Sequence, residues 1–149
     1  MRLAVTTPFA PSPAALAAAQ ETAARRSLPF QPRATRSLAE VADAAGADAL
    51  LVLGGFASLW VDGDEQRWHP GMGGLRAKRL LHGERITGDS FLEAARFRPG
   101  DAVLDCTLGL GADALVAAAA VGPAGRVVGL ESSPALAARA GEGFARLPG

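Results

Sequence analysis

The sequence of 149 residues predicts an α/β protein. Two apolar runs, at residues 102–104 and 126–130, have the length of buried strands. The alanine-rich stretch 112–121 between them has the length of a helix. A strand, a helix and a strand this close together form a βαβ unit, which implies a pair of parallel strands. A further observation is that strand-length apolar runs and capped helices also fill the N-terminal part.

Local signals place the elements of the N-terminal part. Ser12 offers an N-cap before Pro13, and Ser37 with Glu40 forms a capping box. Asp62-Gly63, between the apolar run 56–61 and the strand expected at 64–68, is a hairpin signal. The expected elements are a strand around 3–5, helices at 13–26 and 38–45, strands at 49–53, 56–61 and 64–68, and helices at 75–81 and 90–97.

Two glycine-containing segments are expected to lack regular structure. Residues 69–74 are glycine-rich and are expected to form a loop, and residues 98–100 read Arg-Pro-Gly and form a turn. We place a domain boundary at this turn. The sequence therefore predicts a small α/β domain at 1–98 with a hairpin and covering helices, and a second domain at 99–149 that ends in a helix at 134–146.

Composition excludes several classes of protein. The charges of fifteen basic and fifteen acidic residues cancel, so the net charge does not favour binding to an acidic membrane or a nucleic acid. A single cysteine, Cys106, excludes an internal disulfide and is typical of a reducing compartment, so we expect a cytoplasmic protein. With only two histidines no zinc site is expected, and no apolar run is long enough to span a membrane.

A glycine motif follows the first strand of the βαβ unit. Residues 109–114, Gly-Leu-Gly-Ala-Asp-Ala, satisfy G-x-G-x-x-G/A and lie between a predicted strand and a predicted helix. Glu131 ends the next strand 22 residues after Gly109, near the interval at which an acid accepts hydrogen bonds from ribose hydroxyls. Ligands bind outside the carboxyl ends of parallel strands. Glu131 and Asp105 each follow such a strand, so both are expected to line the same ligand site.

The acid in front of the glycines indicates the kind of ligand. A carboxylate at Asp105 would repel the pyrophosphate of a dinucleotide. S-adenosylmethionine fits better, because it has no phosphate and carries a sulfonium and an ammonium cation beside its ribose. We expect Asp105 to hold the glycine segment and the cationic end of the ligand, and Glu131 to bind the ribose hydroxyls.

The motif also resembles that of a known family. Residues 105–111, Asp-Cys-Thr-Leu-Gly-Leu-Gly, resemble motif I of class I S-adenosylmethionine-dependent methyltransferases, D-x-G-x-G-x-G, with Thr107 in place of the first glycine. The longer string D-C-T-L-G-L-G-A-D-A is similar to the methyltransferase family that includes the bacterial enzymes modifying a guanine of small-subunit ribosomal RNA. Residues 5–7, 32–38 and 69–72 look similar to the N-terminal region of one branch of that family.

The resemblance implies a Rossmann-like methyltransferase fold, S-adenosylmethionine as cofactor and RNA as substrate. It assigns to the cofactor site, together with the acids already discussed, the residues Asp105, Thr107, Gly109, Gly111, Ala112, Asp113, Glu131 and Ser132. Asp113 is also favoured by the helix dipole alone. His69 and Arg76 become candidates for substrate contact, and Cys106 is expected to be a buried small hydrophobe rather than a nucleophile.

The chain contains fewer strands than the implied fold needs. A class I methyltransferase has about seven strands in its sheet, and the sequence supplies the first two, so the catalytic residues stay unknown. We expect a truncated chain whose open sheet is covered by a complementing chain or in a homo-oligomer. Two alternatives remain: a non-catalytic cofactor-binding or interaction fragment, and an NAD-dependent oxidoreductase.

Overall fold

The computed structural model describes residues 1–147 and shows a mixed α/β protein of two compact units. Unit 1 consists of Met1–Trp68 and the chain from Pro134 onward, and unit 2 consists of His69–Ser133. The sequence predicted a boundary at residues 98–100, which lie within unit 2. The helix after the last strand belongs to unit 1, although the sequence assigned it to the second domain.

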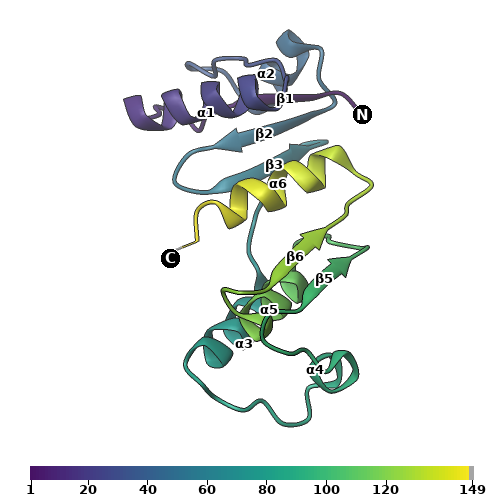
Figure 1. Ribbon diagram of the computed structural model, residues 1–149. Helices are drawn as coiled ribbons and strands as arrows, with labels where there is room; N and C mark the ends of the chain where they lie inside the picture. The colour runs from purple at the N-terminus through teal and green to yellow at the C-terminus, as the bar shows by residue number, and fades with distance from the viewer. Residues whose placement is uncertain (148–149) are drawn as a thin grey trace. The chain divides into compact units, whose positions relative to one another are not determined.

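Unit 1 is built on a four-stranded mixed sheet of order β1-β2-β3-β4 (Figure 1). Strands β1 and β2 are parallel, whereas β3 and β4 continue the sheet as antiparallel neighbours. The elements of unit 1 are β1 (Leu3–Thr6), α1 (Pro13–Arg25), α2 (Leu38–Ala45), β2 (Ala49–Leu53), β3 (Ala57–Val61), β4 (Asp64–Arg67) and α6 (Pro134–Phe144).

The two faces of this sheet are covered by different helices. Alternate residues of β2 point to opposite faces. Leu51 and Leu53 pack in one cluster with buried alanines of α1 and α6, including Ala19 and Ala138. Residues of the opposite set, such as Leu50, pack against α2 on the other face. Because all five residues of β2 are buried, this strand forms the centre of the unit.

Local signals at the helix and hairpin ends act as the sequence predicted. The side chain of Ser12 accepts a hydrogen bond from the amide of Ala15, and both hydrogen bonds of the Ser37–Glu40 capping box are present. Asp62-Gly63 joins β3 to β4 with positive φ at both residues, as a tight hairpin turn requires. These predictions are confirmed.

A buried acid on α6 ties this helix to α1. The carboxylate of Glu142 is 4% exposed and lies 2.8 Å from Arg25, 3.0 Å from Arg26 and 3.3 Å from Arg146. Burial acts against its charge, but the hydrogen bonds from Arg26 and Arg146 outweigh burial and hold the pKa of Glu142 below the ordinary 4.5. The acid therefore stays ionised at neutral pH.

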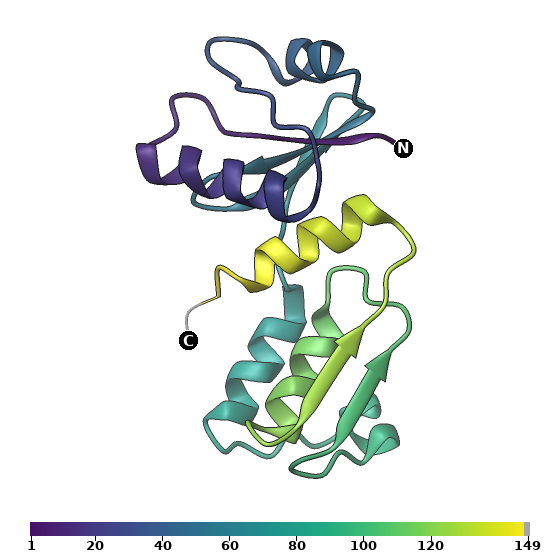
Figure 2. The same ribbon diagram turned by 45° about the horizontal axis from the view of Figure 1, so that its top comes forward.

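Unit 2 is a parallel two-stranded sheet with helix α5 packed against it (Figure 2). Helix α5 connects the two strands and α3 lies alongside α5. The elements are α3 (Gly71–Leu81), α4 (Ser90–Ala95), β5 (Ala102–Asp105), α5 (Ala112–Val121) and β6 (Arg126–Gly129). The predicted βαβ order of strand, helix and parallel strand is confirmed.

The strands of unit 2 are less buried than the sequence predicted. Leu104 is 59% exposed, Leu130 51% and Val128 37%, whereas both runs were expected to be buried strands. The prediction of burial is wrong because a strand is buried on both sides only where structure covers both faces of its sheet. In the described chain, α5 contacts both strands, and the side chains of the exposed set face solvent.

The start of α3 also differs from the prediction. The helix begins at Gly71, so residues 71–74 are helical rather than part of a loop. A Cβ atom added to Gly73 would lie 2.4 Å from the carbonyl oxygen of Ala112, at the start of α5. Glycine is required there for close packing between two helices, a tertiary requirement that local propensity does not reveal.

Replacing Glu142 by glutamine should destabilise the protein. Glu142→Gln leaves three arginines without their counter-charge, and we expect the free energy of unfolding at pH 7 to fall by about 2–4 kcal/mol in urea unfolding. Because the pKa of Glu142 is lower in the folded state, its contribution is present above pH 4.5 and is lost as the pH falls below that value through the folded pKa. The variant should therefore lose part of the acid sensitivity of the wild type.

Glu21→Gln is the matched control for this measurement, because Glu21 is an exposed acid on α1. It should change the free energy of unfolding by less than about 0.5 kcal/mol. Equal effects of the two substitutions would contradict a stabilising role for Glu142.

Candidate functional site

The predicted site residues all lie in unit 2, and most of them surround the carboxyl ends of β5 and β6. The two strands end together, since Asp105 pairs with Gly129. Beyond this pair, the amide of Leu130 donates to the carbonyl of Asp105 at 2.7 Å. The amide of Leu108 in turn donates to the carbonyl of Leu130 at 2.9 Å. The segment 106–111, here named the glycine loop, is thus joined to the end of β6.

The glycine loop has a backbone conformation that needs its two glycines. Gly109 has φ of 53° and Gly111 has φ of 77°, both in the left-handed region that side chains disfavour. Gly111 is the N-cap of α5, and its amide donates to the carbonyl of Leu108 at 2.7 Å. A Cβ atom at Gly109 would meet nothing closer than 3.8 Å, so space is open beside this residue.

Two carboxylates hold the glycine loop through its amides. Oδ1 of Asp105 accepts a hydrogen bond from the amide of Thr107 at 2.9 Å. Oε2 of Glu131 accepts one from the amide of Gly109 at 2.9 Å, and its Oε1 accepts one from the amide of Ser133 at 2.9 Å. Glu131 was predicted to bind ribose and Asp105 to hold the loop, and in this structure both acids hold the loop.

The charge of Glu131 is stabilised by these contacts. Hydrogen bonds from the amides of Ser133 and Gly109 outweigh desolvation and lower the pKa of Glu131 below its usual range. Each carboxylate oxygen has two lone pairs, so Glu131 retains acceptor capacity for hydroxyl groups while it holds the loop. The site therefore presents a fixed negative charge beside the glycine loop.

Arg76 links the site to a neighbouring helix. Its guanidinium donates to Asp113 at 3.0 Å and to the two carboxylate oxygens of Asp89 at 2.6 and 2.8 Å. Asp89 also caps α4, and the Arg76 hydrogen bonds are the main reason that the pKa of Asp89 is lowered. A predicted substrate residue and a predicted cofactor residue are thus brought together as an ion pair. The sequence analysis did not find Asp89.

The other predicted residues lie at the edge of the site. Ala112 begins α5 against Gly73, and Thr107 and Ser132 are exposed. Nδ1 of His69 accepts a hydrogen bond from the amide of Gly71 at the start of α3, at 2.9 Å. Cys106 is exposed, so the prediction of a buried small hydrophobe is wrong. Within the described residues of unit 2, α5 packs against the short sheet, and the loop after β5 that carries Cys106 is exposed.

The described chain was also searched for features of other classes of protein. Within residues 1–147, no three or more His, Cys, Asp and Glu side chains are grouped so that they could hold a metal ion. Over the same residues, no helix has the length and apolar character needed to cross a membrane.

Comparison with known proteins gives one curated relative. The uncharacterized protein YpiP of Bacillus subtilis (strain 168) is 37% identical to this chain over 131 residues. The match covers 87% of this chain and 49% of YpiP, so the chain spans about half the length of the curated relative that it matches. No protein-family model matches the chain, and no solved structure matches it.

Glu131→Gln should loosen the glycine loop. A neutral amide accepts more weakly than a carboxylate, so we expect the Gly109 amide to exchange with solvent roughly five- to tenfold faster in NMR hydrogen exchange. Glu84→Gln is the control, because Glu84 is an exposed acid of unit 2 paired with Arg79. Unchanged exchange at Gly109 in Glu131→Gln would contradict the role of the acid.

Gly73→Ala should disrupt the packing of α3 against α5. The added methyl group would overlap the backbone of Ala112, and we expect the free energy of unfolding to fall by about 1–3 kcal/mol in urea unfolding. Gly55→Ala is the control, because a Cβ atom there would have no neighbour within 4 Å. A stabilised Gly73→Ala variant would show that the close approach is absent in solution.

Proposed function

We propose that unit 2 is the beginning of a Rossmann-like fold that binds S-adenosylmethionine, and that the protein belongs to the class I methyltransferases. The observation that carries this proposal is the hydrogen bond between the Gly109 amide and the Glu131 carboxylate at 2.9 Å. It joins the two sequence features from which the cofactor was inferred, the glycine motif and the acid after the second strand. YpiP is uncharacterized, so the support comes from this chain alone.

The charge around the glycine loop favours this ligand over NAD. A phosphate-binding loop needs free amides that point at the anion. Here the Gly109 amide is bound by Glu131 and the Thr107 amide by Asp105, so two carboxylates lie where a pyrophosphate would need donors. A ligand with a sulfonium and an ammonium group would instead be attracted to these acids.

The residues present fit such a cofactor. Glu131 would accept hydrogen bonds from the ribose hydroxyls, and the open space beside Gly109 would let the ligand approach the backbone. Asp105 would face the cationic end, and Thr107, Ala112, Asp113 and Ser132 are the further proposed contacts. When bound, S-adenosylmethionine supplies an electrophilic methyl group, whose transfer depends on positioning and charge rather than on a nucleophile of the protein.

RNA is the proposed substrate class. Lys78 and Arg79 are exposed basic residues of α3, in the same unit as the glycine loop, and Arg85 follows in the next loop. Basic side chains of this kind bind phosphates of a nucleic acid without reading its sequence. His69 and Arg76 stay candidates for substrate contact, with Arg76 acting through its ion pair with Asp113.

A second candidate function rests on the open face of the β5–β6 pair. Leu104, Val128 and Leu130 are exposed there, and a two-stranded sheet is marginally stable without further cover. The alternative proposal is a non-catalytic cofactor-binding or interaction fragment whose open sheet is covered by a complementing chain or a second copy. In that case the glycine loop would contribute to binding a cofactor or a second chain and would take no part in catalysis.

Calorimetric titration with S-adenosylmethionine, S-adenosylhomocysteine and NAD distinguishes a protein that binds S-adenosylmethionine from an oxidoreductase and from a fragment that binds none of the three. We expect the first two ligands to bind and NAD not to bind. Glu131→Gln should weaken S-adenosylmethionine binding about tenfold or more, because it removes a hydrogen bond to a charged group. Glu84→Gln should leave the affinity unchanged. Binding of NAD alone would indicate an oxidoreductase, and binding of none of the three would favour the interaction fragment.

A further inference from the structure

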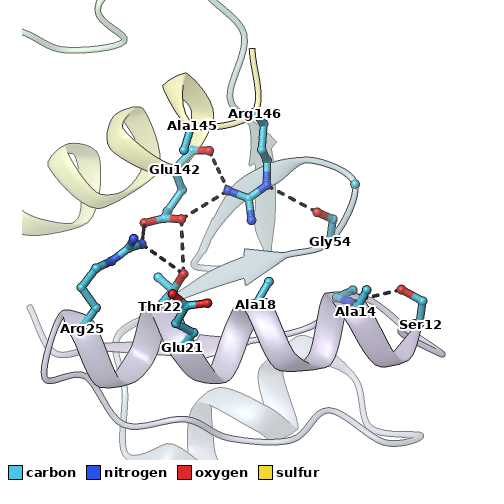
Figure 3. Close-up of a pocket in the computed structure, with 12 residues that line it drawn as sticks. Ser12, Ala14, Ala18, Glu21, Thr22, Arg25, Gly54, Glu142, Ala145 and Arg146 are labelled. Carbon is cyan, nitrogen blue, oxygen red and sulfur yellow. Dashed lines mark hydrogen bonds and ion pairs between the residues drawn. The ribbon is translucent and has the colours of Figure 1, made fainter. Parts of the chain in front are cut away.

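Unit 1 contains a groove of about 480 Å³ that the proposed methyltransferase function does not use. It lies between α1, the end of α6 and the loop after β2 (Figure 3). Its wall is formed largely by small residues, among them Ala14, Ala18, Gly55 and Ala145. A cavity of this size is in the range of small-molecule sites, about 300–1,000 Å³. Small side chains leave room for the body of a ligand along α1.

One end of the groove has an excess of positive charge. Arg25, Arg26 and Arg146 share the single buried carboxylate of Glu142. The groove is lined by Arg25 and Arg146 and by Glu21 and Glu142, whose charges cancel. Arg26 lies behind the lining, 3.0 Å from Glu142, and adds the one positive charge in excess. A structural ion pair would need only one arginine, so this end of the groove can accept an anion.

Two of these arginines keep donors that the protein does not use. Arg25 donates through Nη2 to Thr22 and Glu142, and Arg146 donates through Nε to the carbonyl of Gly54 and through Nη1 to Glu142. Nη1 of Arg25 and Nη2 of Arg146 have no hydrogen-bond partner within residues 1–147. Figure 3 shows the two side chains approaching Glu142 from different sides. Forked guanidinium donors match the oxygens of a phosphate group.

The far end of the groove is the first turn of α1. Ser12 caps this helix of 13 residues, and Ala14 and Ala15 line the groove. Pro13 has no amide hydrogen and the amide of Ala15 is bound by Ser12, so this end supplies apolar surface rather than free donors. The groove thus has its arginines at one end and an apolar wall along α1.

We propose that this groove binds a small organic phosphate, with the phosphate group against Arg25 and Arg146 and the organic body along Ala14 and Ala18. The groove is formed by residues of unit 1 alone, whereas the glycine loop belongs to unit 2. The two ligand sites are therefore independent, and either proposal can fail without the other.

The test is an NMR titration of the full chain in about 0.15 M chloride with phenyl phosphate, inorganic phosphate and phenol. Phenyl phosphate has no ribose or adenine, so it does not address the proposed cofactor site. We expect saturable binding of both phosphates, tighter for phenyl phosphate, with amide shifts at Ala14, Ala18, Gly55 and Ala145. Phenol should not bind.

Two pairs of variants locate the binding. Arg25→Gln should weaken phenyl phosphate binding about tenfold or more, whereas Arg98→Gln, at an exposed arginine outside the groove, should not change it. Ala18→Leu fills the groove without removing an ion pair and should also weaken binding, and Ala17→Leu on the same helix is its control.

Five results would overturn the proposal, and three of them concern affinity and location. These are no saturation at millimolar concentration, equal affinity of Arg25→Gln and the wild type, and shifts confined to residues outside the groove. Equal binding of phenol and phenyl phosphate would exclude the phosphate contact, and affinity for phenyl phosphate no higher than for inorganic phosphate would exclude the organic ligand. Because Ala18→Leu preserves the Glu142 ion pairs, the test remains decisive if Arg25→Gln fails to fold.

Discussion

The hydrogen bond from the Gly109 amide to Glu131 is the contact on which the candidate site depends. It spans the gap between the loop after β5 and the end of β6, and the left-handed backbone of Gly109 aims the amide at the acid. Since the same carboxylate also accepts from Ser133, its charge is held in place before any ligand arrives. The proposed preference for S-adenosylmethionine over a ligand with a pyrophosphate rests on this charge.

Unit 1 uses a buried acid in a different way. Glu142 lies among three arginines and connects α6 to α1, so a helix from the end of the chain completes a sheet formed by its beginning. Close packing supports the same connection, because Gly143 lies where a Cβ atom would overlap Trp68, and Trp68 meets Phe144 edge-on. The excess of arginines over acids is more than packing requires and is the basis for the proposed phosphate site.

Local sequence signals predicted much of the fold because each acts within a few residues. The Ser12 cap, the Ser37–Glu40 capping box and the Asp62-Gly63 turn are all present. For the candidate site, the spacing of 22 residues predicted that Gly109 and Glu131 lie together where the two parallel strands end, and the two residues are hydrogen-bonded there. A parallel βαβ unit places the ends of its strands side by side, so this spacing carries three-dimensional information.

The sequence by itself determined the order of the elements, the positions of the glycines and the acids that follow the strands, because these depend on local backbone preferences. Only the tertiary structure decided which faces are covered and which charges meet. The helical start of α3 depends on Gly73 touching α5, and the exposure of Leu104 depends on what lies over the sheet. The pairing of Arg76 with Asp113 and the burial of Glu142 join residues far apart in the chain, and no local pattern encodes such contacts.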